Sequence, residues 1–173
     1  MAERLDTTQI ANNKLEIIEL INKYAVTFDA RDLESFYNLF TEDCVWSLTV
    51  PTRKEPIEYL SPRTALKEQG YSNFLGLEVP VGASSFHVQT GTVFREISDH
   101  SARTITQALI VSQQFDDDGA EIDGMTWHAG RNQANILFIG VYHDKFAKVD
   151  GLWLFAERTF HASNPSKHIS NPV

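Results

Sequence analysis

Apolar residues recur three and four positions apart near the N-terminus and form nearly continuous runs in the rest of the chain. The first pattern covers residues 6–28 and predicts an amphipathic helix with one buried face. Asp6 followed by Gln9 is typical of a helix N-terminus, because the two side chains can cap free backbone N–H groups. After a polar break, residues 33–40 predict a second, short helix.

Segments rich in β-branched and aromatic residues follow, and each predicts a strand. The expected strands span residues 44–50, 85–97, 102–115, 132–149 and 152–161. Asp150-Gly151, between the last two, is typical of a tight hairpin. Prolines interrupt residues 51–80, so we expect a loop there and one helix at 63–71, which would form a wall or lid of a binding pocket.

Helices followed by a run of long strands are the pattern of an α+β domain. The simplest way to bury the helices is a strongly curved antiparallel sheet that wraps around them as a cone and encloses an apolar pocket at its open end. The length of 173 residues fits a single domain, 1–173. We expect its core at about residues 9–162 and a poorly ordered tail at 163–173.

Composition and charge narrow the classes of partner. The net charge is −8, from 15 basic and 23 acidic residues, which argues against nucleic acid or an anionic membrane surface. No apolar run is long enough for a transmembrane helix, and the N-terminus shows no secretory signal. Cys44 is the single cysteine, so no intrachain disulfide can form. We therefore expect a cytoplasmic protein in which Cys44 is a buried structural thiol rather than a nucleophile.

Motifs for metals and nucleotides are missing from the sequence. The six histidines lack the paired spacing of a metal site, and there is no phosphate-binding glycine loop, dinucleotide fingerprint or nucleophile elbow. We expect no metal and no cofactor.

Asp29, near the end of the first predicted helix, and His87, at the start of a later strand, are the best candidates for a proton-transfer couple. A carboxylate and an imidazole that face each other in an apolar pocket can transfer protons near neutral pH. His87 would be the general base, and Asp29 would accept its other ring N–H and stabilise the imidazolium. The residues alone also allow a purely structural hydrogen bond, or a local turn of Asp29 with Arg31.

Three segments carry a resemblance to a known family. They read IIELINKYAVTFDARDLESFYNLFTEDCVW, SSFHVQTGTV and GVYHDKFAKVDGLWLF. The chain, over about residues 15–160, resembles the SnoaL-like families of the superfamily named for nuclear transport factor two. The resemblance implies the cone-shaped fold. It implies much less about activity, because this superfamily includes dehydratases, isomerases, cyclases, epoxide hydrolases, oxygenase small subunits and non-catalytic binders.

The resemblance also implies roles for three residues. Enzymes similar to scytalone dehydratase, bile-acid dehydratase and lindane dehydrochlorinase hold an acid–His pair in the pocket, and Asp29 and His87 fall on the matching positions. Tyr24 matches a tyrosine that the bile-acid enzyme uses, and it would stabilise a developing oxyanion. Packing of Tyr24 in the core explains its place on the helix equally well.

One strand departs from the pattern of those enzymes. Where two of them carry an extra histidine or aspartate, this chain offers Thr104, Thr106 and Gln107. Thr106 would then present its hydroxyl to a substrate oxygen. The expected substrate-binding residues are Trp46, Tyr59, Thr106, Tyr142 and Phe146.

These observations lead to one expected function and several alternatives. We expect an acid–base enzyme, a dehydratase-like lyase or an isomerase or cyclase, that acts on a hydrophobic polycyclic or aromatic molecule in secondary or xenobiotic metabolism. The alternatives are a non-catalytic ligand-binding module, an oxygenase small subunit and an epoxide hydrolase. The family commonly assembles through its open sheet face, so we expect a homodimer or homotrimer.

Overall fold

The structure, a computed structural model, describes residues 6–70, 83–115 and 132–162. Its helices are α1 (Thr7–Asp29), α2 (Leu33–Tyr37) and α3 (Arg63–Gly70). Its strands are β1 (Phe40–Thr49), β2 (Glu58–Leu60), β3 (Ala83–Ile97), β4 (Ser101–Phe115), β5 (Asn132–Val149) and β6 (Leu152–His161). The tail for which we expected poor order, residues 163–173, lies outside the described residues.

The two N-terminal helices begin at aspartate caps. The Asp6 side chain accepts a hydrogen bond of 3.2 Å from the Thr8 backbone N–H, and Asp32 does the same for Ser35 at the start of α2. Gln9 does not reach back to Asp6, because its amide instead donates to Asn13 at 3.1 Å. Asp6 alone therefore caps α1.

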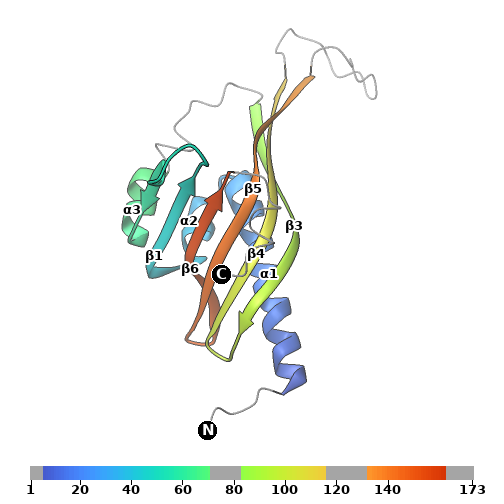
Figure 1. The fold of residues 1–173 in the computed structure, drawn as a ribbon, viewed down its shortest axis with the longest axis vertical. Coiled ribbons are helices and arrows are strands. Elements are labelled where there is room, and N and C mark those ends of the chain that lie inside the picture. The colour runs from blue at the N-terminus through green and yellow to red at the C-terminus, as the bar shows by residue number, and fades with distance from the viewer. Residues whose placement is uncertain (1–5, 71–82, 116–131, 163–173) are drawn as a thin grey trace.

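The strands form one sheet of six strands in the order β2-β1-β6-β5-β4-β3. The sheet curls around α1, which lies along one of its faces, and it does not close into a barrel (Figure 1). This confirms the expected α+β fold with a curved sheet around N-terminal helices. One pairing differs from the antiparallel expectation, because β1 and β6 run parallel. The sheet is therefore mixed.

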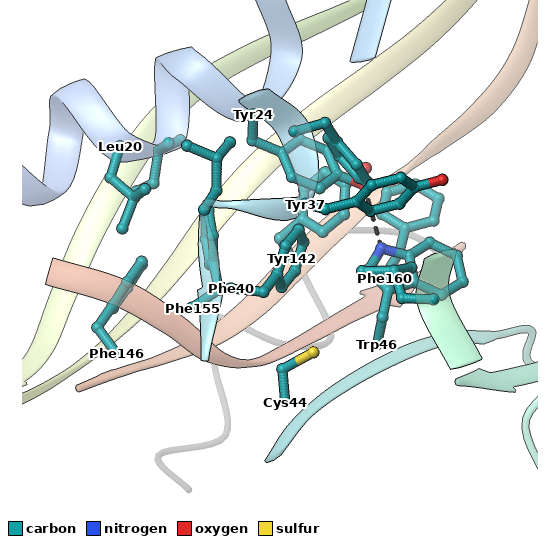
Figure 2. Packing of buried hydrophobic residues seen from close by; sticks show 14 of the residues in the cluster. Leu20, Tyr24, Tyr37, Phe40, Cys44, Trp46, Tyr142, Phe146, Phe155 and Phe160 are labelled. Carbon is teal, nitrogen blue, oxygen red and sulfur yellow. Dashed lines mark hydrogen bonds between the residues drawn. The ribbon is translucent and has the colours of Figure 1, made fainter. Parts of the chain in front are cut away.

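The core lies between α1 and the concave face of the sheet. The helix contributes Ile17, Leu20, Ile21 and Tyr24, all almost fully buried. The sheet contributes mainly aromatic rings, which Figure 2 shows packed below the helix. Strand side chains alternate between faces, so alternate residues of β4, β5 and β6 point into this core, and on β6 the alternation shifts by one residue at an irregularity between Phe155 and Glu157.

Gly140 permits the close approach of β5 and β6. A Cβ atom there would overlap the His161 carbonyl oxygen and lie 2.9 Å from Cζ of Phe160. Because the obstacle is backbone, it cannot be relieved by rotation of a side chain. The short distance between these strands therefore requires glycine.

We expect Gly140→Ala to lower the free energy of unfolding by about 2 kcal/mol or more, because the added methyl group forces β6 away from β5. Urea denaturation measures this. The matched control is Gly151→Ala, where the Cβ meets open space but φ is +83°, so only backbone strain of about 1 kcal/mol applies. Equal losses in the two variants would contradict the packing explanation.

Candidate active site

Asp29 holds His87 through two hydrogen bonds. Its Oδ1 lies 2.7 Å from the ring Nδ1, and its Oδ2 accepts the His87 backbone N–H at 2.8 Å. The two side chains are only 13% and 6% exposed, respectively. The carboxylate thus fixes both the ring and the strand that carries it.

The local structure explains why these residues meet across 58 positions of sequence. Asp29 is the last residue of α1, and the helix ends because Arg31 adopts a positive φ of 59°. On β3, His87 and Gln89 point toward α1, since they are two residues apart. Gln89 Nε2 donates to the Ile21 carbonyl at 3.0 Å, which gives a second tie between this strand and α1.

This geometry suits proton transfer. When a carboxylate accepts the Nδ1–H of an imidazole, the neutral ring keeps its lone pair on Nε2, and a positive charge on the ring is stabilised. The rings of Phe28 and Tyr24 lie 4.9 and 5.9 Å from the His87 ring, between centroids. An apolar wall of this kind strengthens the interaction between Asp29 and a charged imidazolium.

Tyr24 lies at the centre of a hydrogen-bonded group of aromatic side chains. Its hydroxyl accepts a hydrogen bond of 3.1 Å from Nε1 of Trp46, drawn as a dashed line in Figure 2, and it is also bonded to the hydroxyl of Tyr142. Burial raises the pKa of Tyr24, and the nearby Arg158 offsets part of this effect. Both phenols stay protonated near neutral pH, because burial raises the pKa of Tyr142 as well.

Arg158, whose place the sequence left open, lies against the rings of both tyrosines. Its Cζ is 3.9 Å from the ring centroid of Tyr24 and 3.7 Å from that of Tyr142. The guanidinium is fully buried and pairs with Asp144 at 3.6 Å. Burial raises the pKa of Asp144 to about 6, although Arg158 works in the opposite direction.

Sequence reasoning assigned no role to Asp144. A signal was present, since Asp144 alternates with Tyr142 and Phe146 on one face of a strand, and both of these are buried. A carboxylate on a buried face needs a partner, and Arg158 occupies the register position opposite it on β6.

The remaining predicted residues lie at different distances from this group. Thr106 is buried beside Tyr142 on the adjacent strand, and its hydroxyl is 3.1 Å from that of Thr92. Phe146 packs in the core against Phe155, with ring centroids 5.0 Å apart. Tyr59 is 61% exposed. It lies opposite Ser47 on β1, the residue after Trp46, so its side chain points to the other face of the sheet from Trp46. Tyr59 therefore lies on the face away from the helices and apart from the other candidates.

Cys44 is buried, and burial raises the pKa of its thiol to about 11, as befits a structural cysteine. Within residues 6–70, 83–115 and 132–162, no three His, Cys, Asp or Glu side chains are grouped so that they could hold a metal ion.

Comparison with known proteins identifies the family. The chain matches the SnoaL-like domain over residues 9–159, and it belongs to this family. No curated protein matches the chain.

Several solved structures share the fold. The chain is similar to a putative scytalone dehydratase from Novosphingobium aromaticivorans, with 19% identity, 92% of this chain and 89% of that chain covered, and a TM-score of 0.68. It is similar to a hexachlorocyclohexane dehydrochlorinase from Novosphingobium barchaimii, with 17% identity, 92% of each chain covered and a TM-score of 0.64. It is also similar to the beta subunit of a putative aromatic-ring-hydroxylating dioxygenase from N. aromaticivorans, with 16% identity, 97% and 100% covered and a TM-score of 0.65.

In the part of the chain that the structure describes, no helix is long and apolar enough to cross a membrane.

We expect Asp144→Asn to change how stability depends on pH. The folded-state pKa of Asp144, about 6, lies above the ordinary 3.8, so the folded protein keeps a proton that the unfolded chain releases. Its stabilising contribution is complete below about pH 4 and is lost as the pH rises through 6. Since one pKa unit corresponds to about 1.4 kcal/mol, the stability of the variant relative to the parent should rise by about 3 kcal/mol between pH 4 and 7.

Urea denaturation at a series of pH values measures this difference. The matched control is Glu157→Gln, which removes a half-exposed carboxylate from the neighbouring β6 position. A stability difference between Asp144→Asn and the parent that stays constant from pH 4 to 7 would show that Asp144 does not titrate in this range.

Proposed function

We propose that this protein is a cofactor-independent acid–base enzyme that acts on a hydrophobic aromatic or polycyclic small molecule. A dehydratase-type lyase is the first choice, and an isomerase or cyclase is the second. The observation that carries the proposal is the pair of hydrogen bonds that His87 donates to the Asp29 carboxylate, beside the buried side chain of Tyr24. The membership of the SnoaL-like family supports it.

In the proposed elimination, Nε2 of His87 removes a proton from a carbon atom of the substrate. The electron pair of that C–H bond forms a double bond while the neighbouring C–O bond breaks. Asp29 stabilises the imidazolium, which then protonates the leaving hydroxyl group so that it departs as water and neutral His87 is restored. Tyr24 donates its O–H to a carbonyl oxygen that gains negative charge in the transition state.

Tyr24 is suited to this donor role. Its oxygen accepts hydrogen bonds from Trp46 and Tyr142, and its own proton can then be donated onward. Donors that point at a hydroxyl oxygen polarise it and strengthen the hydrogen bond that it gives in turn. The names of similar structures, a scytalone dehydratase and a hexachlorocyclohexane dehydrochlorinase, support an elimination on a ring-containing substrate.

A non-catalytic role is the second candidate. Its support is the similarity to a dioxygenase beta subunit, which spans 97% of this chain and all of that one. A subunit of that kind needs the fold but no proton-transfer couple, so loss of His87 would leave its function intact.

We also propose that the protein is a cytoplasmic homodimer or homotrimer. The sheet face away from α1 carries exposed apolar side chains on β3 and β5, among them Phe86, Val88 and Ile139, which are 48%, 46% and 52% exposed. Apolar area of this kind on a sheet favours self-association, which analytical ultracentrifugation of the full chain measures.

We expect His87→Ala and Asp29→Asn each to lower kcat/KM by about 10²- to 10⁴-fold, the usual contribution of general acid–base catalysis. The assay follows the appearance of conjugated enone absorbance in a panel of hydrophobic β-hydroxy ketones, and chloride release from halogenated cyclohexanes. Thermal unfolding of each variant shows whether the fold is retained.

Asp32→Asn is the matched control. It removes the carboxylate at the start of α2, three residues from Asp29, and asparagine caps a helix as well as aspartate does. Activity should be unchanged in this variant. Full activity in both His87→Ala and Asp29→Asn, with the fold intact, would reject the enzyme and favour the binding module.

A further inference from the structure

The concave face of the sheet carries a row of polar side chains across four strands. The strand register places Thr104, Asp144, Arg158 and Trp46 side by side on β4, β5, β6 and β1. All four are buried. The row runs beneath Tyr24. Trp46 donates a hydrogen bond to the Tyr24 hydroxyl, and Arg158 lies against the Tyr24 ring.

Arg158 is held in place from several sides. Its Nη2 donates to Oε1 of Gln89, and its Nη1 lies 3.6 Å from Asp144. The guanidinium lies over the rings of Tyr24 and Tyr142, which are inclined to each other at 66°, and its Cζ is 4.6 Å from the ring centroid of Phe155. A cation packed against three aromatic rings, with a carboxylate beside it, has little freedom to move.

The same contacts connect Arg158 to the proposed proton-transfer couple. Gln89, which accepts from Arg158, follows His87 by two residues on β3 and also bonds to α1 through the Ile21 carbonyl. Tyr24, which Arg158 also contacts, lies against the His87 ring with the two ring centroids 5.9 Å apart. Arg158 therefore touches both elements that bring Asp29 and His87 together, without touching either residue.

We propose that Arg158 is a positioning residue for the Tyr24–Tyr142 phenol pair, and that Asp144 sets how much of its positive charge acts on the Tyr24 oxygen. The guanidinium holds the two rings at a fixed separation and stabilises negative charge on the phenol. The Asp144 carboxylate opposes that charge. The consequence for catalysis rests on the proposed function, whereas the effect on the phenols does not.

The charges around Tyr24 agree with this division of roles. Arg158 lowers the pKa of the phenol and Asp144 raises it, against a larger increase from burial. The other ionisable groups near Tyr24, Arg158 and Asp144 are Asp29 on α1, His87 on β3, Tyr142 on β5 and Glu157 on β6. Among the described residues, Asp144 and Arg158 form the buried charge pair beside these rings, and Arg158 has the larger effect on Tyr24 while Asp144 has a smaller, opposing one.

The test measures the acidity of the phenols directly and needs no substrate. The full chain is labelled with 3-fluorotyrosine, a stronger acid than tyrosine, and its ¹⁹F resonances are titrated from pH 6 upward. Tyr24→Phe and Tyr142→Phe identify the two signals. Asp144→Asn, which keeps Arg158, is compared with Glu157→Gln, which removes a carboxylate from the other face of β6.

We expect Asp144→Asn to increase the acidity constant of Tyr24 about tenfold, because Arg158 then acts without its counter-charge, and Glu157→Gln to change it by less than about threefold. Arg158→Lys keeps the charge but cannot stack as a plane. It should therefore leave the acidity within about threefold while it shifts and broadens both ¹⁹F resonances.

Equal effects of Asp144→Asn and Glu157→Gln on Tyr24, or sharp unshifted resonances in Arg158→Lys, would overturn the proposal. If Asp144→Asn does not fold, the ¹⁹F titration of the parent protein tests the proposal instead. Its Tyr24 and Tyr142 resonances should move with a midpoint near pH 6, where Asp144 titrates, and this should persist in His87→Gln. If the acidity of Tyr24 does not respond to Asp144 while His87→Ala is inactive, this inference is rejected and the proposed function stands.

Discussion

The packing of Tyr24 is the contact on which the arrangement of this molecule depends. The side chain leaves α1 and reaches residues of four different strands: Trp46 on β1, His87 on β3, Tyr142 on β5, and Phe155 and Arg158 on β6. A ring in contact with so many elements has one stable position, because a small shift would open gaps or cause overlaps on several sides. The tilt of α1 over the sheet, and with it the place of Asp29, follows from that position.

The helix end and the edge strand are then joined by Asp29 itself. Its carboxylate accepts both the ring and the backbone N–H of His87, so the same group orients the imidazole and fixes β3 against α1. Stability and the proposed chemistry therefore share these atoms. A proton-transfer couple of this kind requires a rigid frame, since its reacting atoms must be held within a fraction of an ångström.

The buried pair of Asp144 and Arg158 is costly for the fold. Burying two charges removes them from water, and well-packed apolar residues of similar volume often give equal or greater stability. The aromatic rings and Gln89 offset part of the cost. Packing alone does not favour this buried pair. It is more readily understood if the charge of Arg158 acts on the neighbouring phenols, which is the role that we propose for it.

Sequence periodicity was sufficient for most secondary structure. Residues 6–28 were predicted as a helix and Thr7–Asp29 form α1, while the predicted bounds 132–149 and 152–161 are those of β5 and β6. These patterns are local, because burial of one helix face or one strand face repeats along the chain itself. Asp29, His87 and Tyr24 could be chosen as candidates for a similar reason, since their motif lies in continuous segments.

Only the tertiary structure decided which residues meet across the sheet. The parallel pairing of β1 with β6, the outward face of Tyr59 and the packing of Arg158 against Tyr24 and Tyr142 all depend on strand order and register. A shift of one residue in register would turn every side chain of a strand to the other face, and no local pattern reports it. The sequence by itself determined most of the elements and the candidate residues for chemistry, whereas β2 and the contacts between those residues were decided by long-range packing.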